Sequence, residues 1–187
     1  LIPMLSLTAL MGFLLFSSGT SLKVQAPEAP ELPLYAVTLT AYNAVAAQTD
    51  SNPLETASGA YSNPEIIAAR SQDLRDELPF GTIIEIDGTN ALKEDCGYNV
   101  VAPLVGYRVI ADSMNARYTD RIDILLGTKA EYATTDKGMK NPAEVLGICK
   151  GVVVRVVGYV DIKNIPETQE ALIALVHGTV KELAFNK

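Results

Sequence analysis

Short apolar segments, each ended by a cluster of turn residues, constrain the fold of this chain more than any other feature. Apolar and polar residues alternate in residues 35–42, as expected for a strand with one buried face. Helical patterns are few: a short one at residues 129–134, and a longer one at residues 166–185 with an apolar face. Frequent turns and few helices are typical of a small closed barrel. The sequence therefore predicts an all-β (mainly β) six-stranded barrel with a few short helices and a C-terminal helix. The six predicted strands are residues 35–42, 65–69, 81–87, 105–111, 122–126 and 151–158.

Composition limits the possible partners. The chain has 187 residues, enough for one domain with appendages, and 48% of them are hydrophobic. Its net charge of −7 provides no basic surface to neutralise phosphates, so we expect no nucleic-acid partner. Tryptophan is absent and aromatic residues make up 6% of the chain, so any bound sugar must stack on a few tyrosines.

The N-terminal part of the chain indicates export. Residues 1–18 carry no charge, a length and composition typical of a secretory signal peptide or a short membrane anchor. A proline-rich spacer is predicted to follow at residues 20–34. We therefore divide the chain into a signal peptide or anchor (1–19), the spacer (20–34), the barrel domain (35–160) and a C-terminal helical extension (161–187). The expected location is extracytoplasmic, either secreted or membrane-anchored.

Cysteine and histidine are scarce. In an exported chain the two cysteines, Cys96 and Cys149, are expected to form one disulfide, the alternative being two free thiols in a reducing setting. The single histidine, His177, falls in the C-terminal helix, which argues against a histidine-based triad or a zinc site. We expect no metal and no cofactor.

Two acidic residues stand out in the predicted strands. Residues 109–112 form an apolar run that ends in Asp112, and Asp123 lies between Ile122 and Ile124 in the next strand. Because strand residues alternate in direction, Asp123 points away from its apolar neighbours. Two acids joined by one loop can face each other across a cleft, an arrangement suited to acid–base chemistry on a sugar. Alternatively, Asp112 caps a turn and Asp123 pairs with Arg121 or Arg117.

The order of these blocks resembles the three-aspartate domain family over residues 37–157. That family is similar to the catalytic domain of membrane-bound lytic transglycosylase A and includes stationary-phase survival proteins. The resemblance implies a six-stranded double-psi β-barrel and a role in peptidoglycan remodelling. The matching blocks are VTLTAY (37–42), TASG (56–59), IIAA (66–69), LPFGT (78–82), YRVIAD (107–112) and RIDIL (121–125).

Two of the family's three acids match this chain residue by residue. The first falls on Asp112 and the catalytic acid/base falls on Asp123, whereas Arg70 and Ser71 stand where the third acid is expected. The loop after the first acid also differs, at residues 113–117. The implied reaction cleaves the MurNAc–GlcNAc β-1,4 bond in peptidoglycan by attack of the muramoyl C6 hydroxyl, with a 1,6-anhydro product. The pKa of Asp123 is expected to be raised by Asp112 and by its own apolar neighbours.

Several polar residues near these acids are candidate substrate ligands, although turn structure or packing would equally explain some of them. Two other functions remain open for the same residues. One is a non-catalytic cell-wall polysaccharide-binding module like the expansins, in which the acids only hold the loops together. The other is an inverting β-glucan hydrolase, which requires carboxyl groups roughly 6.5–9.5 Å apart. In each case we expect a monomer that binds a cell-wall glycan. The candidate ligands are Tyr42, Thr56, Ser58, Asn115, Arg117 and Arg121.

Overall fold

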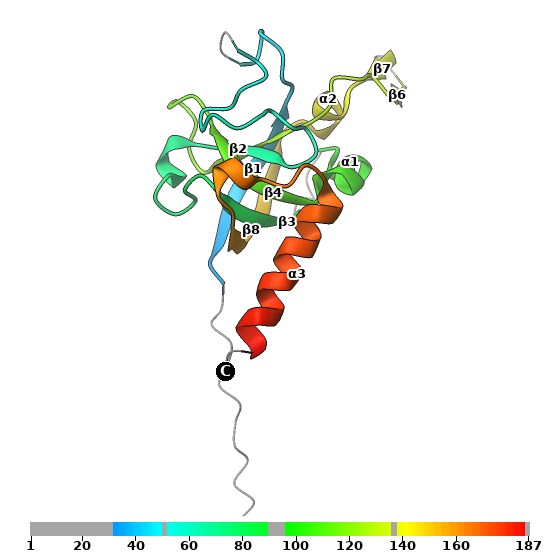
Figure 1. The fold of residues 1–187 in the computed structure, drawn as a ribbon. Coiled ribbons are helices and arrows are strands. Elements are labelled where there is room, and N and C mark those ends of the chain that lie inside the picture. The colour runs from blue at the N-terminus through cyan, green and yellow to red at the C-terminus, as the bar shows by residue number, and fades with distance from the viewer. Residues whose placement is uncertain (1–31, 50–51, 90–95, 136–137, 186–187) are drawn as a thin grey trace, which may run out of the picture. The chain divides into compact units, whose positions relative to one another are not determined.

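Six strands close into one mixed β-barrel in the computed structural model, which describes residues 32–49, 52–89, 96–135 and 138–185 (Figure 1). The strand order around the barrel is β1-β5-β2-β4-β3-β8, and the pairs β1–β5 and β2–β4 are parallel. This arrangement confirms the predicted mainly β fold with a closed six-stranded barrel. The predicted signal or anchor segment and nearly all of the spacer lie outside the described residues. The barrel strands are β1 (Leu34–Tyr42), β2 (Ile67–Arg70), β3 (Thr82–Asp87), β4 (Tyr107–Ser113), β5 (Arg121–Leu125) and β8 (Cys149–Tyr159).

The barrel interior is filled by β-branched and leucine side chains from alternating strand positions. Leu39, Ile110 and Ile124 are fully buried there, together with Val152 and Val154 of β8. Burial of such side chains contributes about 1.5–3 kcal/mol each. Because alternate residues point inward, the residues between them face the outer side of the barrel, where the loops and the C-terminal helix lie.

Helices cover parts of the outer surface. Helix α3 (Gln169–Phe185) begins beside the barrel and extends past it in Figure 1. Its Leu172 and Val176 pack in an outer apolar cluster that includes Val109 of β4. The C-terminal helix was predicted at residues 166–185 and is confirmed. The shorter helices are α1 (Tyr98–Val105) and α2 (Pro142–Leu146), with 3-10 turns at Gln72–Leu74 and Ile162–Asn164.

The predicted helix at residues 129–134 is wrong. This part of the chain enters a two-stranded hairpin formed by β6 (Tyr132–Thr134) and β7 (Gly138–Lys140). Gly138 adopts a φ of +71°, a backbone conformation that glycine allows. Thr134 Oγ1 donates a hydrogen bond to the Gly138 carbonyl at 2.7 Å. The turn geometry and the cross-strand pairing outweigh the weak helical pattern of so short a segment.

The predicted disulfide is present. Cys96 and Cys149 are bonded, with their Cα atoms 5.5 Å apart. The bond joins the segment before α1 to the first residue of β8, and Cys149 is fully buried in the barrel core. A disulfide of this kind persists in an oxidising environment, which favours an extracytoplasmic location. No helix in the described ranges is long and apolar enough to cross a membrane.

One buried arginine connects α1 to the barrel. Arg108 has no exposed surface, and its guanidinium donates to the carbonyls of Val105 (2.6 Å), Pro64 (2.8 Å) and Leu125 (3.0 Å). Burial lowers the pKa of Arg108 to about 10, so the group stays charged at neutral pH. A cation at a helix C-terminus satisfies carbonyls that the helix itself leaves unpaired. Arg108 therefore has a structural role.

Candidate functional site

A row of four residues crosses the outer face of the barrel at one end. Asp123 of β5 pairs in register with Thr40 of β1 on one side and with Ala69 of β2 on the other. Ala69 pairs in turn with Asp112 of β4. Residues in register on neighbouring strands point to the same side of a sheet, so both acids face outward, with Ala69 between them.

A bulge in β4 puts Asp112 in this row. Ala68 pairs with Ile110 and the next residue, Ala69, pairs with Asp112, so Ala111 is an extra residue in β4. Without it, Asp112 would share the inward direction of Ile110, which is buried in the barrel core. Bulges of this type redirect side chains and are frequent beside functional sites. The backbone N–H of Ser58 donates to the carbonyl of Ala111 at 3.1 Å and so connects a neighbouring loop to the bulge.

Asp112 is held by three hydrogen-bond donors. Tyr42 Oη donates to Oδ2 at 2.8 Å, and the backbone N–H groups of Ala57 and Ser113 donate to Oδ1 at 2.9 Å and 2.8 Å. Burial and then the charge of Asp112 raise the pKa of Tyr42, so its hydroxyl keeps its proton and acts as the donor. Donors around both oxygens suit an ionised carboxylate, which only accepts hydrogen bonds.

Asp123 has a different environment. Burial raises the pKa of its carboxyl to about 6, and the negative charge of Asp112 adds to this effect. Thr40 and Arg121, which lie next to it, partly lower the pKa again. Asp123 Oδ1 and Thr40 Oγ1 are both buried. In the described part of the chain, neither atom has a partner within normal hydrogen-bond geometry. A carboxyl with this pKa exchanges its proton near neutral pH, as a general acid or base must.

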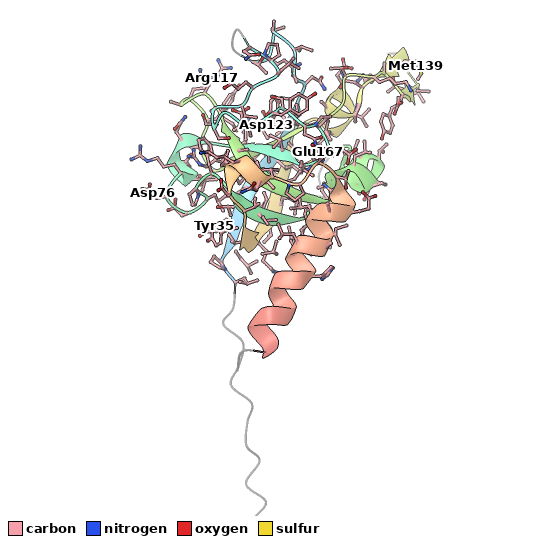
Figure 2. The ribbon with its side chains drawn as sticks, in the orientation of Figure 1. Tyr35, Asp76, Arg117, Asp123, Met139 and Glu167 are labelled. Atoms are coloured by element: carbon pink, nitrogen blue, oxygen red, sulfur yellow. A yellow bond between two sulfur atoms is a disulfide. The ribbon has the colours of Figure 1, made fainter. Side chains whose placement is uncertain are left out.

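The two acids line an open groove of about 800 Å³. Tyr42 also lines it, and the outer walls come from residues 47–49, from Glu55 and Ala57, and from the loop at residues 113–118. Figure 2 labels Arg117 and Asp123, which lie at the same, loop-bearing end of the barrel. The groove volume is within the range of small-molecule and oligosaccharide sites.

The other candidate ligands do not all reach the groove. Asn115 and Arg117 line it, but Arg121 does not. The hydroxyls of Thr56 and Ser58 lie 3.0 Å apart, and Thr56 Oγ1 accepts from the backbone N–H of Ala60 at 3.2 Å. These two residues shape the turn that presents the Ala57 N–H to Asp112, and neither lines the groove.

The proposed pairing of Asp123 with an arginine is not found. In the described ranges the side-chain ion pairs within 4.0 Å are Arg75–Asp76, Lys129–Glu131 and Arg155–Glu85. Arg121 influences Asp123 only through its charge. The alternative role of Asp112 as a turn cap is consistent with its two backbone contacts, and its contact with Tyr42 adds to that role.

At the position expected for the family's third acid, the structure has a buried arginine. Arg70 is 7% exposed, donates from Nε to the Leu78 carbonyl at 2.9 Å and lies over the Phe80 ring at 5.0 Å. A different acid, Glu55, lines the groove, and the sequence reasoning did not select it. Glu55 lies in a loop with no strand pattern, so its position depends on how that loop folds back over β4.

No group of three or more His, Cys, Asp or Glu side chains in the described residues is arranged to hold a metal ion. The site combines a buried acid that can exchange a proton with a second acid fixed by hydrogen bonds, above which an open groove can hold a ligand. No protein-family model matches this chain, and no curated protein gives a match to it.

Proposed function

We propose that this protein is a lytic-transglycosylase-like enzyme that cleaves the MurNAc–GlcNAc β-1,4 bond of peptidoglycan. The observation that carries the proposal is the Asp123 carboxyl, which is largely buried at the groove, has a pKa of about 6 and has one oxygen outside normal hydrogen-bond geometry with any of the described residues. Such a group is roughly one-tenth protonated at pH 7 and can both donate and accept a proton.

In the proposed reaction Asp123 transfers its proton to the glycosidic oxygen as the bond from that oxygen to C1 of MurNAc breaks. The carboxylate then takes the proton of the C6 hydroxyl, whose oxygen attacks C1 and closes a 1,6-anhydro ring. The proton returns to Asp123, so no water is consumed and the enzyme is regenerated. Asp112, which its three donors hold in place, stabilises the positive charge that develops at the sugar.

Three further observations support this proposal. The mixed six-stranded barrel agrees with the double-psi barrel that the resemblance to the three-aspartate family implies. Asp112 and Asp123, the two family acids present in the sequence, lie in one row on the same groove. The disulfide suits a protein that works outside the cytoplasm, secreted or anchored by residues 1–18, where peptidoglycan is found.

A second candidate function is a cell-wall polysaccharide-binding module. Its support is the hydrogen bonding of Asp112, which connects β1, β4 and the loop at Ala57 and would hold the groove walls together without any turnover. The third possibility, an inverting β-glucan hydrolase, would use the same acids but would consume a water molecule.

Product analysis separates these functions. Purified peptidoglycan is incubated with the protein in ¹⁸O-labelled water, and the released muropeptides are analysed by mass spectrometry. We expect 1,6-anhydro muropeptides without ¹⁸O from the wild-type protein, and none from Asp123→Asn. Asp76→Asn, which removes an exposed acid paired with Arg75, is the matched control and should retain activity. Products that carry ¹⁸O would identify a hydrolase instead, and binding without products would identify a binding module.

A further inference from the structure

A pair of arginines and a tyrosine form a distinct feature at the edge of the groove. The guanidinium carbons of Arg117 and Arg121 lie 4.7 Å and 4.6 Å from the centre of the Tyr118 ring. Arg117 also donates from Nη2 to Tyr118 Oη at 2.8 Å. Contact with an aromatic ring orients a guanidinium and leaves its N–H edge free for a ligand.

The charge of Arg121 acts on the Asp123 carboxyl, but no direct contact joins either arginine to an acid among the described residues. Neither of them makes an ion pair within 4.0 Å in the part of the chain that the structure describes. Arg121 Nε is buried and has no hydrogen-bond acceptor there. The charge of Arg117, which lines the groove, is therefore available to an anionic ligand.

Arg117 differs in charge from the other ionised side chains of the groove, which are acids. Three acids, Glu55, Asp112 and Asp123, line the groove, and Arg117 is the one basic side chain among its described lining residues. Tyr118, which lies under both guanidiniums, also lines it. A neutral glycan would need no cation here, whereas a glycan with a carboxylate would need a cation placed away from the acids.

We propose that Arg117, which lines the groove and is held against the Tyr118 ring, forms a subsite for a carboxylate carried by a side group of the bound glycan. This inference rests on the proposed function, because it assumes that the groove holds a glycan strand. Two sources have this chemistry in peptidoglycan: the free lactyl group of a strand without peptides, and the carboxylates of the stem peptide. A guanidinium can bind either source through two parallel hydrogen bonds.

Binding measurements on the full chain with Asp123→Asn test the subsite, since this background prevents turnover. Three glycans of equal length serve as probes in calorimetry: a chitin oligosaccharide, a peptide-free MurNAc–GlcNAc strand and a peptide-bearing strand. Arg117→Gln is the test variant, because the Arg117 side chain is exposed and, within the described residues, donates a hydrogen bond only to Tyr118. Arg155→Gln is the matched control: it removes one exposed charge from β8, where that arginine pairs with Glu85.

We expect the carboxylate-bearing strands to bind more tightly than chitin, and Arg117→Gln to weaken their binding about tenfold, with chitin binding and the control unchanged. Tighter binding of the peptide-free strand than of chitin identifies the lactyl group as the source. A gain with the peptide-bearing strand alone identifies the stem peptide. If Arg117→Gln weakens all three probes equally, or none of them, the subsite is refuted while glycan binding stands.

The two proposals fail in different ways. If no glycan binds to any form of the protein, both the proposed function and the subsite are wrong. If Arg117→Gln removes the preference for carboxylate-bearing strands but the wild-type protein releases no anhydro product, the subsite stands and the catalytic proposal fails.

Discussion

Asp112 and Asp123 illustrate how the fold gives two identical side chains different environments. Asp112 accepts three hydrogen bonds, so its charge is already satisfied by the protein. The Asp123 carboxyl is largely buried beside that charge, and its pKa is about 6. One of its oxygens has no hydrogen-bond partner in the part of the chain that the structure describes. Pairs of acids whose environments differ in this way are frequent in glycosidases, where one acid carries the proton and the other remains charged.

The raised pKa of Asp123 predicts a pH-dependent cost in stability. Its folded pKa of about 6 lies above the ordinary value of 3.8, so between these values the folded protein binds more protons than the unfolded chain. The free energy of unfolding therefore falls as pH rises through this window. A shift of about two pKa units corresponds to about 3 kcal/mol as an upper value. We expect Asp123→Asn to stabilise the protein by about 1–3 kcal/mol at pH 7.5 and to have little effect at pH 3.5.

Urea unfolding of both proteins at the two pH values measures this difference. Asp76→Asn is the control, because the Asp76 side chain is 84% exposed and should show no comparable change between the two pH values. A loss of stability in Asp123→Asn at pH 7.5 would mean that the ionised carboxylate makes a favourable contact that an amide cannot replace.

At the scale of secondary-structure elements, the site depends on small irregularities in otherwise regular strands. The extra residue Ala111 turns Asp112 outward, and the turn at residues 56–60 presents a backbone N–H to it. Gly59 in this turn has a φ of +82°, which other residues rarely adopt. The disulfide acts at the same scale, because it fixes the start of β8 to the segment before α1.

The Cys96–Cys149 disulfide is expected to stabilise the folded protein rather than to contribute to activity. The bond spans 53 residues of sequence, for which the chain-entropy relation gives about 4 kcal/mol. We expect Cys96→Ala/Cys149→Ala to lower the free energy of unfolding by about 2–4 kcal/mol, with a lower Tm. Thermal unfolding with and without a thiol reductant measures this effect. The wild-type Tm should fall in the reductant and that of the double variant should not, whereas a wild-type Tm that resists full reduction would contradict the prediction.

For the whole molecule, the sequence predicted the features that follow from local patterns. Alternation located the six barrel strands to within a few residues, and the apolar face located α3. Helix α1 was missed because Pro103 lies inside it and the adjoining apolar run suggested a strand. The β6–β7 hairpin was missed because its pairing depends on a turn that the pattern does not reveal.

The candidate site was predictable only in part. Asp112 and Asp123 were identified from their places in strands, but their common row depends on the Ala111 bulge, which has no sequence signature. The contact between Tyr42 and Asp112 joins residues 70 positions apart, so local patterns could not show it. Likewise, the hydroxyls of Thr56 and Ser58 were candidate ligands, but the fold uses them within a turn.

The assignment of Asp123 as the acid is tested most directly by measuring the protonation of its carboxyl together with the rate of the reaction. Carboxyl ¹³C NMR of aspartate-labelled protein, assigned by comparison with Asp123→Asn, gives the pKa, and release of anhydro-muropeptides gives kcat/KM over the same pH range. We predict a midpoint near 6 for the Asp123 resonance and a decline of kcat/KM above pH 6 with the same midpoint, because the proton donor is lost. An Asp123 midpoint near 4, or a rate that stays constant between pH 5 and about 8, would contradict the assignment of Asp123 as the acid.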